Sequence, residues 1–140
     1  MQIIGFNFTK IMVEREDKPH PKLTITQNIN IKEIKKEKVT ISEFEALKIK
    51  FNLLIGYSEN YAKIEFEGNI IILPEKEETK QFLDAWKDKK IPENVRIPLF
   101  NFIMNKCNIK ALYLEDELAL PLHLQNFMPR ITADSEQKKK

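Results

Sequence analysis

The chain has 140 residues, 42% hydrophobic and 31% charged, so it is long enough for one domain with a core and too apolar for a disordered chain. Its net charge of +2, from 23 basic and 21 acidic residues, is not that of a dedicated nucleic-acid binder, which usually carries a strongly basic face. No apolar run approaches the roughly 20 residues of a membrane span, and the single cysteine, Cys107, excludes an internal disulfide framework.

The first predicted strand covers residues 3–16, which are rich in β-branched and aromatic side chains. Its apolar alternation changes parity between Phe8 and Ile11. This change predicts a bulge or bend near Thr9 and Lys10.

A second strand is predicted over residues 22–31, where apolar and polar side chains alternate without interruption. The apolar face is formed by Leu23, Ile25, Ile29 and Ile31. Residues 32–41, "KEIKKEKVTI", either continue this strand or form a charged connection with a short edge strand, and the pattern leaves both open.

Two further strands, over residues 44–57 and 61–74, form a predicted hairpin around the turn at residues 58–60. Pro74 is expected to end the sheet. The side chains expected to face inward are Leu47, Ile49, Phe51, Leu53, Ile55, Tyr57, Ile64, Phe66, Ile70 and Ile72.

Two helices are predicted next. Residues 75–90 begin with acids and end with lysines, as the helix dipole favours, and Pro92 opens a second helix near Glu93. The second helix carries apolar residues at three- and four-residue steps: Val95, Leu99, Ile103, Cys107, Ala111, Leu114 and Leu118. Further apolar residues lie outside that stripe: Phe100, Phe102, Met104 and Leu112.

This wide apolar arc predicts a second surface to bury against, which in a chain of this size is another subunit. The residues expected at that oligomer interface are Leu99, Phe100, Ile103 and Met104. Segregated strands and helices predict an α+β domain over residues 1–131, with a four-stranded antiparallel sheet, helices on one face and an extended C-terminal strap. The polar residues 132–140 are expected to be disordered.

The inventory of chemical groups predicts no catalytic site, no metal site and no cofactor. His20 and His123 lie far apart in the sequence and have no Cys, Asp or His at ligand spacing, so each is expected at the surface or in packing. Cys107 falls on the core stripe and is expected to act as a small buried hydrophobe. The three acids at 115–117 fan around a helix, so a solvated face is expected there.

The lysine-rich stretch "IKEIKKEKV", residues 31–39, is the best candidate for nucleic-acid binding. Its lysines are offset by Glu33 and Glu37, and no aromatic ring lies among them for base stacking. A charged strand edge is the favoured interpretation, because lysines also protect edges from pairing.

The strap after the second helix carries Pro121, Leu122, His123 and Leu124, followed by Asn126 and Phe127. With four strands and a long helix before it, this arrangement resembles the SecB-type export chaperones, in which a Pro-Leu-x-Leu strap follows the helix. It also looks like an archaeal-type branch of that superfamily, in which residues 86–95 add a helix and turn. The acidic surface by which SecB-type chaperones bind their motor partner does not map onto this sequence. The resemblance implies a homodimer or homotetramer that captures unfolded, apolar polypeptide segments, without ATP and without catalysis.

We therefore predict a holdase whose polypeptide-binding groove is lined by Leu122, Leu124, Phe127 and Met128, with the first two buried and the last two at the groove. The alternatives are a strap that only caps the chain's own core, an antitoxin-associated chaperone, and a ribosome- or RNA-associated binding protein. The opening residues, "MQIIGFNFTK", lack a basic segment followed by an apolar one. We thus expect no signal peptide and, given the lone cysteine, a cytoplasmic protein.

Overall fold

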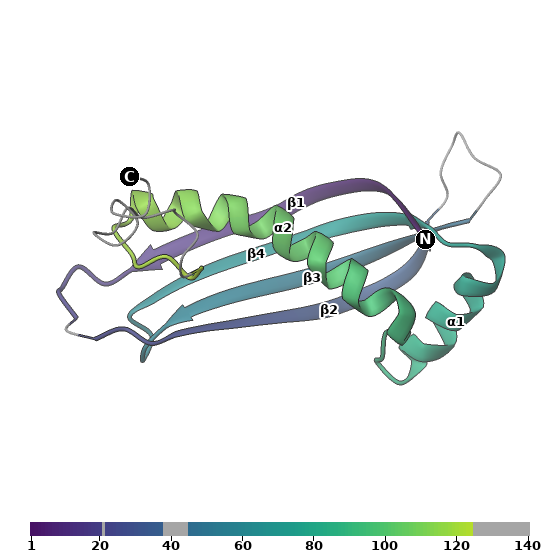
Figure 1. The fold of residues 1–140 in the computed structure, drawn as a ribbon, viewed down its shortest axis with the longest axis horizontal. Coiled ribbons are helices and arrows are strands. Elements are labelled where there is room, and N and C mark those ends of the chain that lie inside the picture. The colour runs from purple at the N-terminus through teal and green to yellow at the C-terminus, as the bar shows by residue number, and fades with distance from the viewer. Residues whose placement is uncertain (21, 38–44, 125–140) are drawn as a thin grey trace, which may run out of the picture.

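A computed structural model describes residues 1–20, 22–37 and 45–124, and shows one antiparallel sheet crossed by a long helix (Figure 1). The expected α+β fold with a four-stranded antiparallel sheet is confirmed. The sheet has the strand order β1-β4-β3-β2, so the chain passes from one edge to the other between its first two strands. The elements are β1 (Gln2–Arg15), β2 (Ile25–Glu37), β3 (Ala46–Tyr57), β4 (Ala62–Leu73), α1 (Lys76–Lys87) and α2 (Glu93–Glu117).

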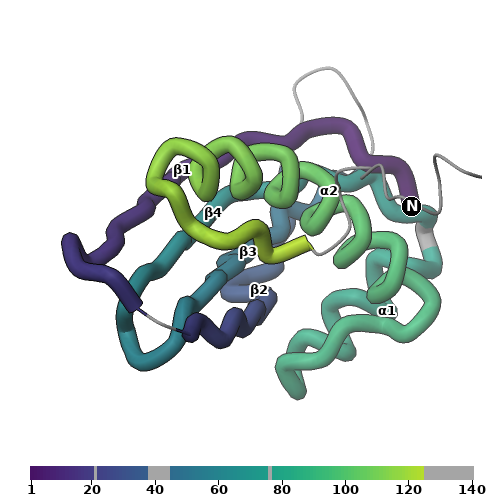
Figure 2. Tube along the Cα trace, turned by 60° about the vertical axis from the view of Figure 1, so that its left-hand side comes forward, coloured from purple at the N-terminus to yellow at the C-terminus, as the bar shows by residue number. Residues whose placement is uncertain are grey.

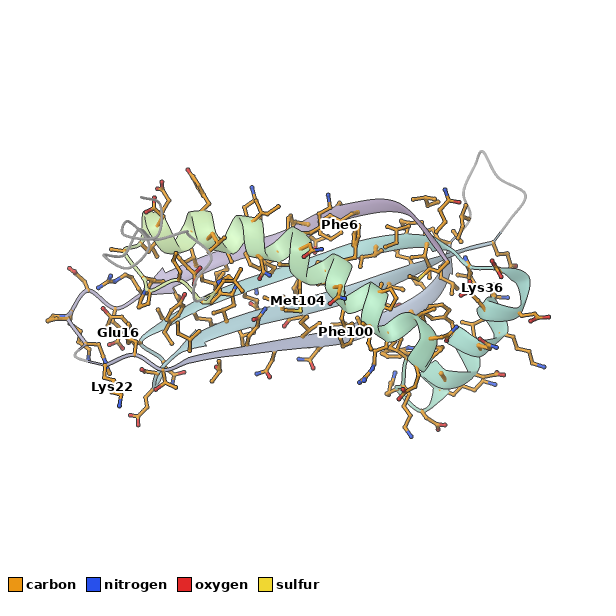
Figure 3. The ribbon with its side chains drawn as sticks, in the orientation of Figure 1. Phe6, Glu16, Lys22, Lys36, Phe100 and Met104 are labelled. Carbon is orange, nitrogen blue, oxygen red and sulfur yellow. The ribbon has the colours of Figure 1, made fainter. Side chains whose placement is uncertain are left out.

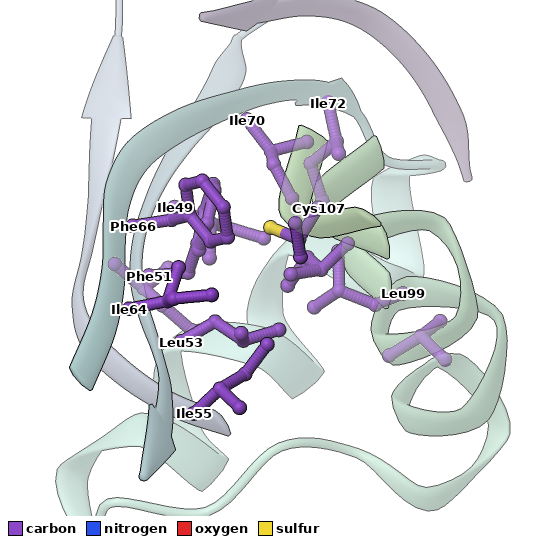
Figure 4. Close-up of a cluster of buried hydrophobic side chains, with 14 of the residues drawn as sticks. Ile49, Phe51, Leu53, Ile55, Ile64, Phe66, Ile70, Ile72, Leu99 and Cys107 are labelled. Carbon is purple, nitrogen blue, oxygen red and sulfur yellow. The ribbon is translucent and has the colours of Figure 1, made fainter. Parts of the chain in front are cut away.

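The core lies between α2 and one face of the sheet (Figure 4). Strands β3 and β4 are central, and their alternation places every second side chain under the helix. All ten side chains expected to face inward on these two strands are fully buried. The register pairs Leu47 with Ile72, Ile49 with Ile70, Leu53 with Phe66 and Ile55 with Ile64.

The edge strands carry irregularities at defined points. In β1 the register slips at Thr9, as the change of parity predicts, and also at Ile4, which the sequence pattern did not indicate. In β2 it slips at Lys32. The strand nevertheless continues to Glu37, so the lysine-rich stretch extends the second strand through that residue; residues 38–44 lie outside the described ranges.

Buried residues on α2 recur at every fourth position: Val95, Leu99, Ile103, Cys107, Ala111 and Glu115. Four residues advance about 40° beyond a full helical turn. The buried stripe therefore winds around the helix through roughly 200° over these five steps. Figure 1 shows the geometry that accompanies this winding, because α2 crosses the sheet diagonally, from the β2 side beside α1 to the β1 side at the far end.

The winding stripe accounts for the wide apolar arc of α2 without a second subunit. Leu99 and Ile103, expected at an oligomer interface, are fully buried against the chain's own sheet. Phe100 and Met104 are half-buried and keep part of their surface free (Figure 3). Phe102 packs edge-on against the Phe6 ring, with 5.7 Å between ring centroids. Within the described residues, neither helix is both long and apolar enough to cross a membrane.

Cys107 lies in the middle of this stripe and is fully buried, as expected for a small hydrophobe. Burial raises the pKa of its thiol to about 12, so the thiol is protonated at neutral pH. A protonated thiol without access to solvent is a packing group rather than a nucleophile.

Gly68 sets how closely β1 approaches the sheet centre. It is paired with Phe8 on one side and Phe51 on the other. A Cβ at Gly68 would lie 2.4 Å from the backbone oxygen of Asn7 on β1 and 2.9 Å from the Phe51 ring, which is itself stacked on Phe6 with 5.7 Å between centroids. The Asn7 oxygen belongs to the backbone of a paired strand and cannot turn aside, so a methyl group here overpacks the sheet.

We therefore expect Gly68→Ala to lower the free energy of unfolding by about 1–3 kcal/mol, the usual cost of overpacking a core. Gly56→Ala is the matched control, because a Cβ there meets only the hydroxyl of Thr26, at 3.1 Å. Urea unfolding followed by circular dichroism measures both. Equal losses for the two variants would show that the contacts with Asn7 and Phe51 are not what restricts position 68.

Candidate functional site

The chain that leaves α2 is tied to the sheet by a buried polar cluster. The helix ends with Ala119 in the left-handed region, at φ 53°, and the Leu120 N–H donates to the Glu115 carbonyl at 2.8 Å. The chain then turns back along the sheet (Figure 2). We call Tyr57, Asn108, Glu115 and His123 the strap anchor, because their side chains join β3, α2 and the strap.

The Glu115 carboxylate is the centre of the strap anchor, and its side chain is fully buried. The His123 backbone N–H donates to its Oε2 at 2.8 Å, and Nδ1 of the same histidine lies 2.8 Å from Oε1. The Tyr57 hydroxyl contacts Oε2 and also lies 3.0 Å from the Pro121 carbonyl oxygen. Burial and the adjacent carboxylate raise the pKa of Tyr57 well above its ordinary value, so the phenol remains a donor.

His123 faces an oxygen atom from each ring nitrogen, because its Nε2 lies 2.7 Å from Oδ1 of Asn108. An imidazole donates from both nitrogens only in its protonated form, which pairs with the Glu115 carboxylate as a buried ion pair. Turning the Asn108 amide would instead offer an N–H donor to a neutral ring. The strap anchor thus contacts both ring nitrogens of His123.

The strap anchor corrects one expectation from the sequence. Glu115 was expected on a solvated face with its two acidic neighbours, and that was wrong for Glu115 alone, since Asp116 and Glu117 are exposed. Glu115 occupies the last position of the winding stripe, one step after Ala111, where the strap covers it. Its spacing of four from Ala111 was the available signal, but an acidic residue does not register as part of an apolar stripe.

A groove follows the first half of β2 on the face that α2 covers elsewhere. Because α2 crosses diagonally, the apolar side chains at this edge remain half-buried. Two hollows lie along it, of about 490 and 560 Å³. We call this the β2 groove; its floor is Leu23, Ile25, Gln27, Ile29 and Ile31, and its walls are Trp86, Ile91 and Phe100 at one end and His123 and Leu124 at the other.

The β2 groove also has polar lining, because Thr24, Thr26 and Asn30 border it beside the apolar floor. The side-chain nitrogen Nε2 of Gln27 is buried and has no hydrogen-bond partner among the described residues. The rim near Trp86 carries Lys89, Lys90 and Arg96 against one acid, Glu93. Lys89 lies over the Trp86 ring, 4.6 Å from its centroid. The groove therefore combines an apolar floor, one unpartnered donor and a rim with excess positive charge.

The strap residues expected to bind polypeptide are placed only in part. Leu122 and Leu124 are half-buried rather than buried, and Leu124 borders the β2 groove. The strap is fixed instead by Leu120, which is 6% exposed, and by the polar contacts of His123. Phe127 and Met128 lie outside the described residues. Gln27 was not singled out from the sequence, because one polar residue within an alternating strand is unremarkable, and Trp86 was expected only on the apolar stripe of the first helix.

Three other features of the described residues bear on function. A larger hollow, of about 880 Å³, lies beneath α1 and is bordered by Lys36 and Glu45, on either side of residues 38–44; we assign it no ligand. The edge lysines Lys35 and Lys36 are exposed and lie 3.9 Å and 3.4 Å from Glu33 and Glu45. Among the residues described, no three His, Cys, Asp or Glu side chains gather as a metal site requires.

Comparisons with known proteins identify no family for this chain. No protein-family model matches it, and no curated protein matches it. A SecB-like chaperone of Mycobacterium tuberculosis, solved with a ChAD peptide from the HigA1 antitoxin, matches 94% of this chain and 92% of its own, at 18% identity and a TM-score of 0.49. At that level of similarity, the function of the β2 groove has to be argued from this chain's own geometry.

The strap anchor predicts a large and local stability effect. Glu115→Ala leaves the buried His123 and Tyr57 side chains without their shared acceptor, so we expect a loss of about 3–5 kcal/mol in the free energy of unfolding. The neighbouring Asp116→Ala removes an exposed carboxylate and should change stability by less than about 0.5 kcal/mol. Thermal and urea unfolding measure both. A loss below 1 kcal/mol for Glu115→Ala would mean that the cluster does not hold the strap.

Proposed function

We propose that this protein is an ATP-independent chaperone, a holdase that binds unfolded polypeptide segments in the β2 groove. The observation that carries the proposal is a half-buried row of β-branched side chains on an edge strand, with aromatic walls and space for a further chain. Apolar side chains of an unfolded client gain free energy by leaving water against such a floor. Leu122, Leu124, Phe127 and Met128 are proposed as further polypeptide-binding residues of the same function.

The proposal keeps the wider expectations from the sequence. Membership of the SecB-like superfamily and of its archaeal-type branch, a role in protein transport, a cytoplasmic location and the absence of catalysis are all part of it. A strap that only caps the core is the competing view. It is weakened by Leu124, which is half-buried beside a hollow of about 560 Å³ instead of filling it.

Replacing the groove floor tests the function. Ile29→Thr with Ile31→Thr keeps the β-branched shape but removes much of the apolar surface. We expect this double variant to bind an unfolded client about tenfold more weakly, which corresponds to 1.4 kcal/mol, and to need more protein to suppress its aggregation. Ile11→Thr, an exposed position on β1, is the control and should behave like the wild type.

The wild type must suppress aggregation of a model client at near-stoichiometric amounts without nucleotide; if it does not, the proposal fails. Salt separates it from the RNA-binding alternative, which rests on the lysines of β2. Phosphate contacts release counterions, so RNA affinity falls steeply with added salt, whereas apolar capture persists. Tight RNA binding with a steep salt slope, and none to unfolded protein, would reverse the assignment.

We also infer a homodimer or homotetramer, now through the outer face of α2. This face presents Ile97, Ile109 and Tyr113, with 62%, 73% and 62% of their surface exposed. They fall on a four-residue ridge completed by Asn101 and Asn105, which carries no charge. Ridges with this spacing pack against each other in helix pairs. Phe100 and Met104 flank the ridge.

Charge on this ridge should disrupt assembly. We expect Ile109→Lys to reduce the mass at micromolar concentration to the 16.6 kDa of a single chain, because a buried lysine without a partner opposes association. Asn94→Lys, at an exposed position near the start of α2, should leave the mass unchanged. Light scattering coupled to gel filtration measures both. A wild type that is itself a monomer would contradict the inference.

A further inference from the structure

We propose that the β2 groove binds its polypeptide as a β-strand added to residues 25–31, and that it selects segments that carry apolar residues and an acidic residue on the same face, two residues apart. This inference rests on the proposed function and adds to it a binding geometry and a class of client. Three independent observations support it: an unprotected strand edge, an unpartnered donor and an excess of positive charge.

The first half of β2 is a free strand edge without the usual protection. Among the described residues, β2 pairs only with β3, so every second residue turns its N–H and C=O away from the sheet. Residues 25–31, "ITQNINI", carry no charge and no bulge. Lysines, bulges and short length prevent a strand edge from pairing with another chain. Residues 25–31 contain neither a lysine nor a bulge.

The other edges of the sheet do carry these devices. The second half of β2 has a bulge at Lys32, and Lys35 and Lys36 follow. The opposite edge strand, β1, has two bulges and the charged residue Lys10. Figure 3 labels Lys22 and Lys36 near the two ends of β2, on either side of the uncharged stretch. Within the strands that the structure describes, the stretch that borders the groove is therefore the one that combines no charge with no bulge.

Gln27 indicates that the occupant offers oxygen acceptors. Its side chain interrupts an otherwise apolar floor between Ile25 and Ile29, and its Nε2 lacks a partner among the described residues. A strand added to β2 would place every second side chain on the groove face. Apolar side chains would lie beside the isoleucines, and a carboxylate opposite Gln27 would accept its N–H. A hydrocarbon ligand offers no such acceptor.

The charge of the rim favours an acidic segment over a second copy of this chain. Lys89, Lys90 and Arg96 outnumber the single acid Glu93 by three to one. A second copy pairing through the same edge would bring the same excess of positive charge, whereas Asp or Glu side chains would neutralise it. The partner that fits is therefore an extended segment whose groove-facing residues, every second one along the strand, are apolar with at least one Asp or Glu among them.

Four synthetic decapeptides labelled with fluorescein test the geometry and the selectivity. One has Val or Leu with a central Asp or Glu at its odd residues and Ser or Thr at its even residues, and its counterpart has Lys at the acidic position. The other two are the acidic peptide with N-methyl groups on the odd or on the even residues. Only one alternate set of N–H groups can point at β2. Fluorescence anisotropy should therefore show about a tenfold loss for one methylated peptide and little change for the other, with the acidic peptide bound more tightly than the lysine peptide.

Two charge reversals on the exposed rim complete the test. Lys90→Glu and Arg96→Glu should each weaken binding of the acidic peptide and strengthen that of the lysine peptide, with a difference that shrinks as salt screens the charges. Lys110→Glu reverses an exposed charge on α2 outside the groove and is the matched control. Equal effects of all three reversals would overturn the selectivity, because only the net charge of the protein would then matter.

The outcomes separate this inference from the proposed function. If the wild type suppresses client aggregation but binds the acidic and lysine peptides equally, or tolerates both methylation patterns, the inference fails and the holdase proposal stands. If the acidic peptide binds with the expected pattern and no aggregation is suppressed, the inference stands and the holdase proposal fails. A peptide that dissociates an assembly of the protein as it binds would assign the edge to a second copy and overturn the inference.

Discussion

The diagonal contact of α2 with the twisted sheet is the constraint on which the rest of the structure depends. A straight helix crossing a twisted sheet touches it along a line that rotates around the helix, and burial at every fourth residue follows that line. Two features follow from the same crossing. At the end of the stripe, an acidic residue rather than an apolar one is buried and is available to hold the strap. At the other edge of the sheet, the apolar side of β2 remains partly uncovered.

His123 connects the buried acid at the end of α2 with the partly uncovered face of β2. Its ring closes the strap anchor through Glu115 and also forms one wall of the β2 groove. The polar contacts that fix the strap therefore fix the width of the groove at that end. At the other end of the groove the wall is formed by Trp86 and Phe100, which are only half-buried and so less tightly held. A site for varied clients benefits from one fixed wall and one that can adjust.

The sequence predicted the features that depend on local residue patterns. It did not predict those that depend on how α2 crosses the sheet. The inward positions of β3 and β4, the bulge at Thr9, the turn at 58–60 and the end of the sheet at Pro74 all follow from alternation and turn chemistry. The strand order and the angle of α2 are set by contacts between distant residues, which periodicity does not encode. The width of the α2 arc was therefore attributed to a second subunit, although winding around one sheet explains it. Glu115 was assigned to a solvated face and Gln27 was overlooked, because pattern analysis treats polar residues as solvent-facing, whereas here each occupies a position in the buried or half-buried face.

Cys107 makes the docking of α2 accessible to kinetic measurement. It is the only thiol of the chain, lies at the middle of the contact line and has no solvent access while the helix is seated. A disulfide-exchange reagent in solution can reach its sulfur only during moments when α2 lifts from the sheet. The rate of thiol modification under native conditions thus reports the local opening free energy of this layer, separately from global unfolding. Occupancy of the neighbouring groove would then register as a change in that opening rate, without any label on the protein or on its client.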